Sequence, residues 1–104
     1  MSDTTMTIEQ ALLRLARLKL AGQAENIARL LLIKANPEWR HPRVIASNLG
    51  MKGPGMSRFQ ARMIADGYLK AEREKSDRRQ MKVTLTTKGT NFLRRIERDW
   101  SREQ

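Results

Sequence analysis

The chain has 104 residues, with 21 Lys and Arg against 11 Asp and Glu, one histidine and no cysteine, for a net charge of +10. This length fits one domain with a core just large enough to fold alone. The missing cysteines exclude disulfides, thiolate zinc sites and thiol redox switches, and one histidine argues against a multi-histidine metal cage. The positive charge predicts a polyanionic partner such as nucleic acid, or simply a well-solvated surface.

No membrane partner is expected. The longest apolar run, residues 30–33, is too short to cross a bilayer. Residues 1–5 lack the basic and apolar regions of a signal peptide. We therefore expect a cytoplasmic protein.

The first predicted helix runs from about Thr7 to Lys19. Thr7 and Gln10 have the spacing of a capping box, and Gly22 follows the predicted end. The apolar residues of this segment cover a wider arc than one core-facing stripe needs. A second chain is therefore expected to cover part of this helix.

The second predicted helix runs from about Gln23 to Ala35 and stops at Asn36-Pro37. Its run Leu30–Ile33 is apolar on all sides, which predicts the centre of the core. The following Trp39-Arg40-His41 is expected to be a short connector or a small strand.

Two short helices then flank a glycine-rich turn. The first is predicted from Pro42 to Leu49, with Pro42 at its start and Gly50 at its end. The second is predicted from about Pro54 to Asp66 and ends at Gly67. On this helix one face carries Met56, Phe59 and Met63, and the other carries Ser57, Arg58, Ala61 and Arg62.

A hairpin and a last helix complete the pattern. Two strands, Tyr68–Glu74 and Gln80–Leu85, are predicted around the polar turn 75–79. The last helix begins after Thr86 and carries one narrow apolar stripe, Phe92, Leu93, Ile96 and Trp100.

The predicted fold is therefore mainly α with a small β-hairpin, a winged helix-turn-helix with flanking N- and C-terminal helices. We assign residues 1–104 to one domain, with N-terminal helices in 7–35, the helix-turn-helix in 42–66, the wing in 68–85 and the last helix in 87–102. A helix fits the major groove of B-DNA, and a hairpin beside it can reach the backbone or the minor groove.

The segment 45–89 resembles the MarR-type transcriptional regulators. The matching residues are Ile45-Ala46-Ser47-Asn48-Leu49-Gly50, Ser57-Arg58, Ala65-Asp66-Gly67-Tyr68-Leu69, Asp77-Arg78-Arg79 and Val83-Thr84-Leu85-Thr86-Thr87-Lys88-Gly89. The most specific part is the acidic-basic-basic turn a few residues before Leu-Thr-x-x-Gly.

The resemblance implies a homodimer that binds palindromic duplex DNA and usually represses a nearby promoter, in a prokaryotic cell, mobile element or phage. Ser57 and Arg58 would lie on the recognition helix, Asp77 would brace the wing, and Arg79 would enter the minor groove. Ala71 stands where the family often has arginine. Because the chain ends about 15 residues after Gly89, we do not expect the small-molecule effector pocket of typical members.

Positive charge is concentrated around the predicted helix and wing. Residues 52–82 hold nine basic and four acidic residues, a net +5 of the total +10. The candidate DNA contacts are Lys52, Gly55, Ser57, Arg58 and Arg62 on the recognition helix, and Arg73, Lys75, Arg78 and Arg79 on the wing, with Asp77 as support. We expect Arg58 to contact a base or a phosphate, Arg62 to contact a phosphate, and Arg79 to enter the minor groove. For Arg78 the alternative is an ion pair with Asp77 or a nearby acidic residue.

A dimer interface is predicted at Leu12, Leu15, Leu93, Ile96 and Trp100, with a plain monomer core as the alternative. No nucleophile–base pair, phosphate-binding glycine loop or carboxylate pair indicates an enzyme, and no cofactor or metal is expected. Three other functions remain open: an architectural DNA-binding protein of low sequence preference, a protein–protein adaptor, and an RNA-binding winged helix.

Overall fold

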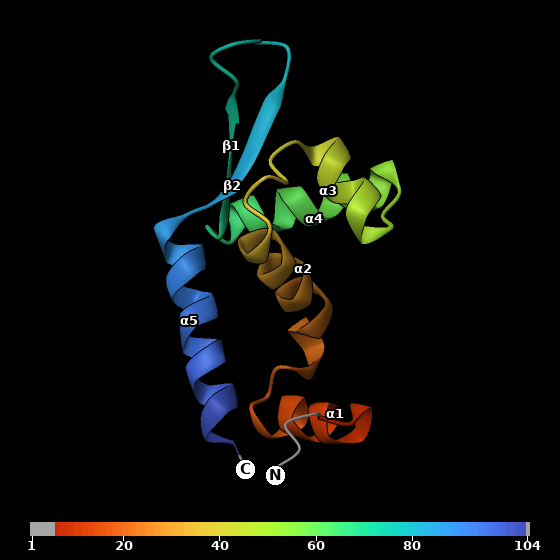
Figure 1. The fold of residues 1–104 in the computed structure, drawn as a ribbon, viewed down its shortest axis with the longest axis vertical. Helices are drawn as coiled ribbons and strands as arrows, with labels where there is room; N and C mark the ends of the chain where they lie inside the picture. The colour runs from red at the N-terminus through yellow and green to blue at the C-terminus, as the bar shows by residue number, and fades with distance from the viewer. Residues whose placement is uncertain (1–5, 104) are drawn as a thin grey trace.

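The computed structural model describes residues 6–103, so the start at residues 1–5, where no signal peptide is expected, lies outside the described part. The elements in chain order are α1 (Ile8–Arg17), a 3₁₀ turn η1 (Ala21–Gln23), α2 (Ala24–Ala35), α3 (Pro42–Leu49), α4 (Gly53–Ala65), β1 (Leu69–Arg73), β2 (Met81–Leu85) and α5 (Thr87–Arg102) (Figure 1). The predicted fold class and order of elements are confirmed, with boundaries shifted by one to a few residues.

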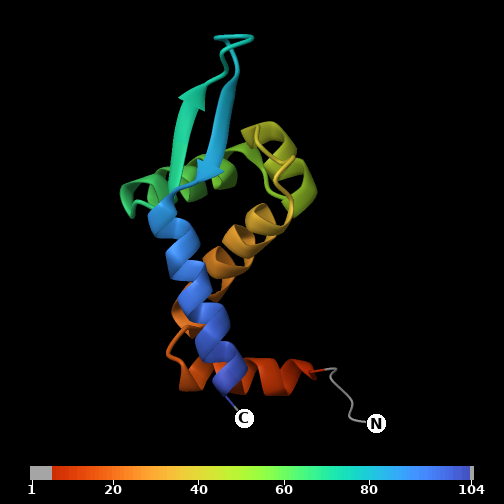
Figure 2. The same cartoon turned by 60° about the vertical axis from the view of Figure 1, so that its left-hand side comes forward.

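The molecule is elongated, with extents of 50 × 28 × 25 Å. The hairpin, α3 and α4 gather at one end, and α1 lies across the opposite end beside the last turn of α5 (Figures 1 and 2). We call the end with α3, α4 and the hairpin the base, and the end with α1 and the last turn of α5 the apex. Helices α2 and α5 connect the two ends.

The core lies in the base and in the adjoining parts of α2 and α5. Its buried residues are Leu30, Ile33, Ile45, Met56, Phe59, Met63, Leu69, Val83 and Leu93. These side chains come from α2, α3, α4, both strands and α5, so a single cluster fixes the base elements to one another. The expectation that all of Leu30–Ile33 lies in the core is wrong for Leu32, which is 44% exposed.

The hairpin is antiparallel, with Leu69 opposite Leu85, Ala71 opposite Val83, and Arg73 opposite Met81. Period-two alternation turns Leu69 and Val83 into the core. The connector before α3 is not a strand, but its Arg40 carbonyl accepts a hydrogen bond from the Val83 amide at 2.6 Å. This bond ties the start of the helix-turn-helix to the outer edge of β2.

Most helix ends follow the predicted signals. Thr7 and Gln10 form a reciprocal capping box at the start of α1, and Gly50 ends α3 in the left-handed conformation at φ 65°. The end of α1 differs from the prediction, since Lys19 rather than a glycine adopts positive φ, at 59°. The Leu20 amide then donates to the Leu15 carbonyl at 2.8 Å and closes the helix before Gly22.

The apolar stripe of α5 packs mainly against other elements of the same chain. Leu93 is 0% exposed and Ile96 is 8% exposed. The assignment of these two side chains to a dimer interface is therefore wrong, because α5 packs them against its own domain. Trp100, one turn further on, is only partly buried.

Candidate nucleic-acid interface

Helix α4 presents two unlike faces. Met56, Phe59 and Met63 are buried, which fixes the rotation of the helix on the core. Ser57, Arg58, Ala61 and Arg62 are exposed, as the 3.6-residue period predicts. Within residues 6–103 no ion pair or hydrogen bond holds the Arg58 guanidinium, so its five donors face solvent.

The start of α4 is bare. An added Cβ at Gly53 or Gly55 would meet nothing within 4 Å. The first-turn amides have no partner within the helix, and the exposed Lys52 is the N-cap residue. Free amides at a helix N-terminus favour an anion, so this end of α4 suits a phosphate. A hollow of about 430 Å³ continues from here between α3 and α4, lined in part by Arg43, Ser57 and Gln60.

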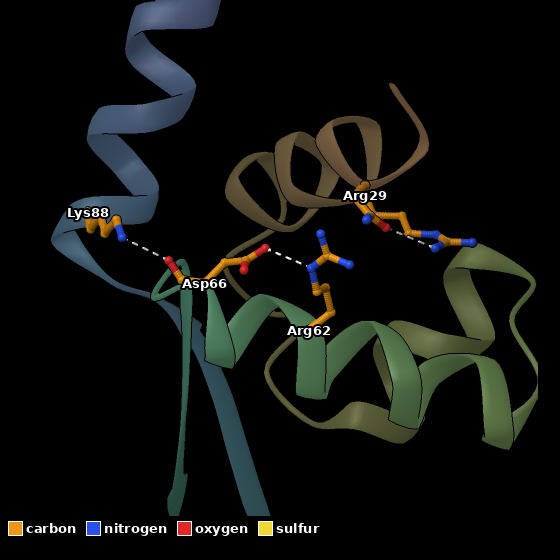
Figure 3. Close-up of polar contacts among 5 residues, drawn as sticks. Arg29, Arg62, Asp66 and Lys88 are labelled. Carbon is orange, nitrogen blue, oxygen red and sulfur yellow. Dashed lines mark hydrogen bonds and ion pairs between the residues drawn. The ribbon is translucent and has the colours of Figure 1, made fainter. Parts of the chain in front are cut away.

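Arg62 is placed differently from the other predicted contacts on α4. Its Nε donates to Asp66 Oδ2 at 3.2 Å. Figure 3 shows the side chain pointing from α4 toward α2 and Arg29, away from the direction in which the wing strands extend. Arg62 therefore has a partner within the chain, whereas Arg58, one turn earlier on α4, has none among residues 6–103.

The wing turn is held by Asp77. Its Oδ1 accepts from the Arg79 amide at 3.0 Å and from Arg79 Nε at 3.4 Å. The Gln80 amide also donates to the Asp77 carbonyl, at 3.0 Å. Such a side-chain turn limits the conformations of the tip. The Arg79 side chain is still 92% exposed, and both Nη groups remain available because only Nε is engaged.

The two other wing arginines have unequal roles. Arg73 Nη1 donates to the Arg78 carbonyl at 2.7 Å, so Arg73 braces the tip from β1. The Arg78 side chain is exposed, and within the described residues it makes no ion pair. The alternative of an Arg78–Asp77 pair is wrong, since Arg79 occupies the carboxylate. Lys75 is likewise exposed.

Sequence reasoning missed Arg43 and undervalued His41. A hollow of about 820 Å³ separates the start of α3 from the wing, and both residues line it together with Asp77 and Arg79. His41 Nδ1 lies 2.9 Å from the Met81 carbonyl and links α3 to β2. The sequence could have indicated Arg43, because it places a basic residue in the first turn of the helix-turn-helix. The structure shows that this residue is exposed.

The acidic residues of the wing do not cancel its charge. Lys70 Nζ lies 3.2 Å from Glu72 Oε1. The hydrogen bond and charge of Lys70, with smaller contributions from Lys82 and Lys75, lower the pKa of the Glu72 carboxyl. Glu72 is thus ionised at neutral pH, and its negative charge is already counted in the net +5 of the segment 52–82.

The apex has the opposite character. No residue of α1 is buried, and Ile8, Leu12 and Leu13 are 76%, 58% and 51% exposed. Polar contacts fix the other side of α1 to α5: Arg14 Nη1 donates to the Trp100 carbonyl at 3.0 Å, and the Arg14 guanidinium lies over the indole ring. The predicted interface residue Leu12 is thus open to a partner.

An apolar hollow of about 480 Å³ lies beside α1, lined by Leu15, Leu31, Ile96 and Trp100 among others. Leu15 and Trp100, both predicted interface residues, are partly buried against their own chain here. Its volume falls within the range of small-molecule pockets. The expectation that this chain has no effector pocket stays a prediction, because a hollow alone does not identify a ligand.

Residues 6–103 contain no cluster of three or more His, Cys, Asp or Glu side chains able to hold a metal ion. None of the helices in this range has the length and apolar character needed to cross a bilayer.

No protein-family model and no curated protein matches the chain. Solved structures do match it. MepR of S. aureus in complex with DNA superposes with a TM-score of 0.72 at 18% identity, covering 88% of this chain and 67% of that one. The repressor CouR bound to a 23-mer DNA duplex gives a TM-score of 0.66 at 28% identity over 96% of this chain and 80% of CouR. FabT of Streptococcus pneumoniae in complex with DNA gives 0.60 at 22% identity, and the match spans 71% of this chain and about half, 51%, of FabT.

These structures are MarR-family winged-helix regulators. The chain therefore has the winged helix-turn-helix fold of that family, and the resemblance predicted from the motifs is confirmed at the level of fold.

Proposed function

We propose that this protein is a transcriptional regulator that binds duplex DNA sequence-specifically as a homodimer and represses by occupying a palindromic operator. The main support is the arrangement of the base, where the open face of α4 and the braced Arg79 lie at the same end of a molecule of net charge +10. The fold match to MepR, FabT and CouR, each solved with DNA, adds to this support.

Helix α4 enters the major groove with Ser57 and Arg58 toward the bases. The unengaged Arg58 guanidinium can bind guanine O6 and N7 in bidentate fashion, which discriminates against other bases by about 1–3 kcal/mol. The wing reaches the adjacent minor groove, where negative potential attracts the free Nη groups of Arg79. Asp77 has already restricted the tip, so less conformational entropy is lost on binding.

The remaining basic groups of the base position the protein without reading sequence. Phosphates are bound by Lys52, by the free amides at Gly53 and Gly55, and by Lys75 and Arg78. Arg43 joins them from the start of α3. Arg73 supports the wing tip and Arg62 contributes mainly through its charge, because both side chains already have partners.

The second protomer associates through the apex. The exposed apolar side chains of α1 are the surface a partner would bury, and a two-fold axis there leaves both bases facing the same way. Two recognition helices then occupy successive major grooves, about 34 Å apart along one face of the duplex. Palindromic half-sites follow from that symmetry.

The proposal includes no catalytic step, cofactor or metal, and it places the protein in the cytoplasm. A small-molecule effector is not part of it. The function is exerted by occupancy, because a dimer covering the operator excludes polymerase.

Selection of bound duplexes from a random pool tests this function. We expect a palindromic site to be recovered. A pool enriched in no sequence would instead support an architectural DNA-binding protein, and preferential binding of an RNA duplex in competition would also contradict the proposal.

Two variants sharpen the selection. Arg58→Ala is expected to relax the preference at one position of each half-site by about 1–3 kcal/mol. Lys75→Ala removes the same charge from the wing and is expected to weaken all duplexes equally. Identical selected sites for wild type and Arg58→Ala would exclude Arg58 as a base-reading residue.

A further inference from the structure

Lys88 lies where electrostatics disfavours a lysine. It is the second residue of α5, whose first turn contains no acidic residue. The N-terminal turn of a helix carries partial positive charge, so a cation there is destabilising unless it finds another partner. The position of the Lys88 ammonium group therefore needs a compensating contact.

That contact is the C-terminal end of the recognition helix. Lys88 Nζ donates to the Asp66 carbonyl at 3.0 Å, and Asp66 is the C-cap residue of α4. Figure 3 shows the lysine reaching from α5 to Asp66, whose carboxylate also binds Arg62. The last carbonyls of a helix lack intrahelical donors and carry partial negative charge, so a lysine satisfies both needs at once.

The Lys88 side chain is exposed, but its stem and ammonium group lie close to other parts of this junction. Its Cδ would lie 3.2 Å from a Cβ placed on Gly67, which has φ 84°. Its Nζ lies 5.5 Å from the centroid of the Tyr68 ring, and that ring stacks on Phe92 of α5 at 4.3 Å. The side chain therefore lies across the gap between the start of α5 and the end of α4, with the Asp66 carbonyl and the Tyr68 ring as its contacts.

Neighbouring bonds fix the same junction. Thr86 Oγ1 donates to the Gly67 carbonyl, and the Thr86 amide donates to the Tyr68 carbonyl at 3.0 Å. Gly89 packs so closely on Tyr68 that an added Cβ would overlap the Tyr68 carbonyl oxygen. The Thr86 bonds thus hold residues 67 and 68, directly after α4, at the start of α5, and Lys88 adds a bond to the C-cap carbonyl of α4 itself.

We propose that Lys88 is a positioning residue that fixes the direction of the recognition helix from α5 without itself contacting DNA. This inference rests on the proposed function. Lys88 reaches Asp66 from α5 on one side of the end of α4. The wing strands extend away from this end on the other side (Figure 3). Loss of the link lets the end of α4 move, which weakens sequence-specific binding while leaving attraction to phosphates intact.

The first test needs no DNA. The amides of Gly67 and Tyr68 close α4 by donating to the Ile64 and Met63 carbonyls, each at 2.9 Å. In Lys88→Met, which keeps the apolar stem, hydrogen exchange at these two amides is expected to accelerate about fivefold. The control Arg95→Met removes an equal charge from an exposed residue of α5, and exchange there is expected to match wild type. Unchanged exchange in Lys88→Met would overturn the inference.

The second test uses a duplex recovered by selection and a scrambled duplex of equal length. Lys88→Met is expected to bind the selected duplex about fivefold more weakly than Arg95→Met does, with equal affinity for the scrambled duplex. The slope of log K against log salt should be the same for both variants. A slope shallower by about 1.8 for Lys88→Met, about 0.9 for each of the two protomers, would identify a phosphate contact and overturn the positioning role. If wild type selects no sequence, the proposed function fails, and the exchange result still decides whether Lys88 holds α4.

Discussion

The base and the apex of this molecule handle apolar residues in opposite ways. In the base, Ile45, Leu69 and Val83 are at most 2% exposed, and the surface is largely charged. At the apex, α1 buries no residue, and Ile8 and Leu12 are more than half exposed. The base therefore buries these apolar side chains within one chain, whereas the apex exposes apolar side chains to water, which is unfavourable.

This contrast separates two kinds of interaction. The base is suited to a charged ligand, because its free groups are Lys and Arg side chains and helix amides. The apex is suited to another apolar surface. Binding at the base should respond to salt, and association at the apex should respond to buried apolar area.

The largest expected effect is that of salt on DNA binding. With about 6–10 phosphate contacts per dimer, raising salt from 50 to 200 mM should weaken operator binding by about 10³–10⁵. Dimer association measured over the same range should not weaken, because it depends on apolar burial. Fluorescence titrations at several salt concentrations give the slope, and salt-insensitive operator binding would contradict the role of the base.

The next largest effect concerns the core. Ile45→Ala should lower the free energy of unfolding by about 2–5 kcal/mol, because Ile45 is fully buried. At a dilution where the chain is monomeric, Leu12→Ala should change it by less than about 0.5 kcal/mol. Urea unfolding measures both. Equal losses would mean that α1 is as well packed as the base.

A charge placed on α1 tests the apex directly. Leu12→Asp should shift the chain from dimer to monomer, since each buried leucine contributes about 1.5–3 kcal/mol and a two-fold interface contains two. Light scattering during gel filtration measures the mass. Leu32→Asp is the matched control, because Leu32 is 44% exposed but lies on α2. A dimer unaffected by Leu12→Asp, or a monomeric wild type at micromolar concentration, would place the interface elsewhere or exclude it.

The smallest predicted effect distinguishes two arginines of equal charge. Arg79→Ala should cost about 1 kcal/mol of operator affinity, roughly fivefold, because its Nη groups are free for the minor groove. Arg62→Ala should cost less, since Asp66 already binds Arg62 and the side chain points toward α2. Binding isotherms at one salt concentration compare them. A larger loss for Arg62 would show that α4 lies on DNA in another orientation.

The local signals in the sequence were sufficient for most of the fold. The Thr7–Gln10 capping box, the Gly50 terminus and the α4 faces are set by bonding and periodicity within a few residues, and the structure has all three. The sequence places the signal for the end of α1 at Gly22. The helix instead ends at Arg17, and Lys19 adopts the positive φ that turns the chain. The positive φ of Lys19 is compensated by two local bonds, from the Lys19 amide to the Ala16 carbonyl and from the Leu20 amide to the Leu15 carbonyl.

Contacts between distant segments could not be predicted in this way. Pattern alone could not tell whether the α5 stripe covers its own domain or a partner, and only packing on α2 and the sheet buries Leu93 and Ile96. The same limit applies to Arg62 and Arg73, whose partners depend on how side chains meet in space.

The sequence by itself determined a small basic domain, its winged helix-turn-helix order and the residues available to contact a polyanion. These follow from charge, periodicity and turn chemistry, which act over a few residues. The tertiary structure decided which of those side chains are free, which brace a neighbour, and that Lys88 reaches the end of α4. Such assignments depend on the relative placement of whole helices, and packing of the common core sets that placement.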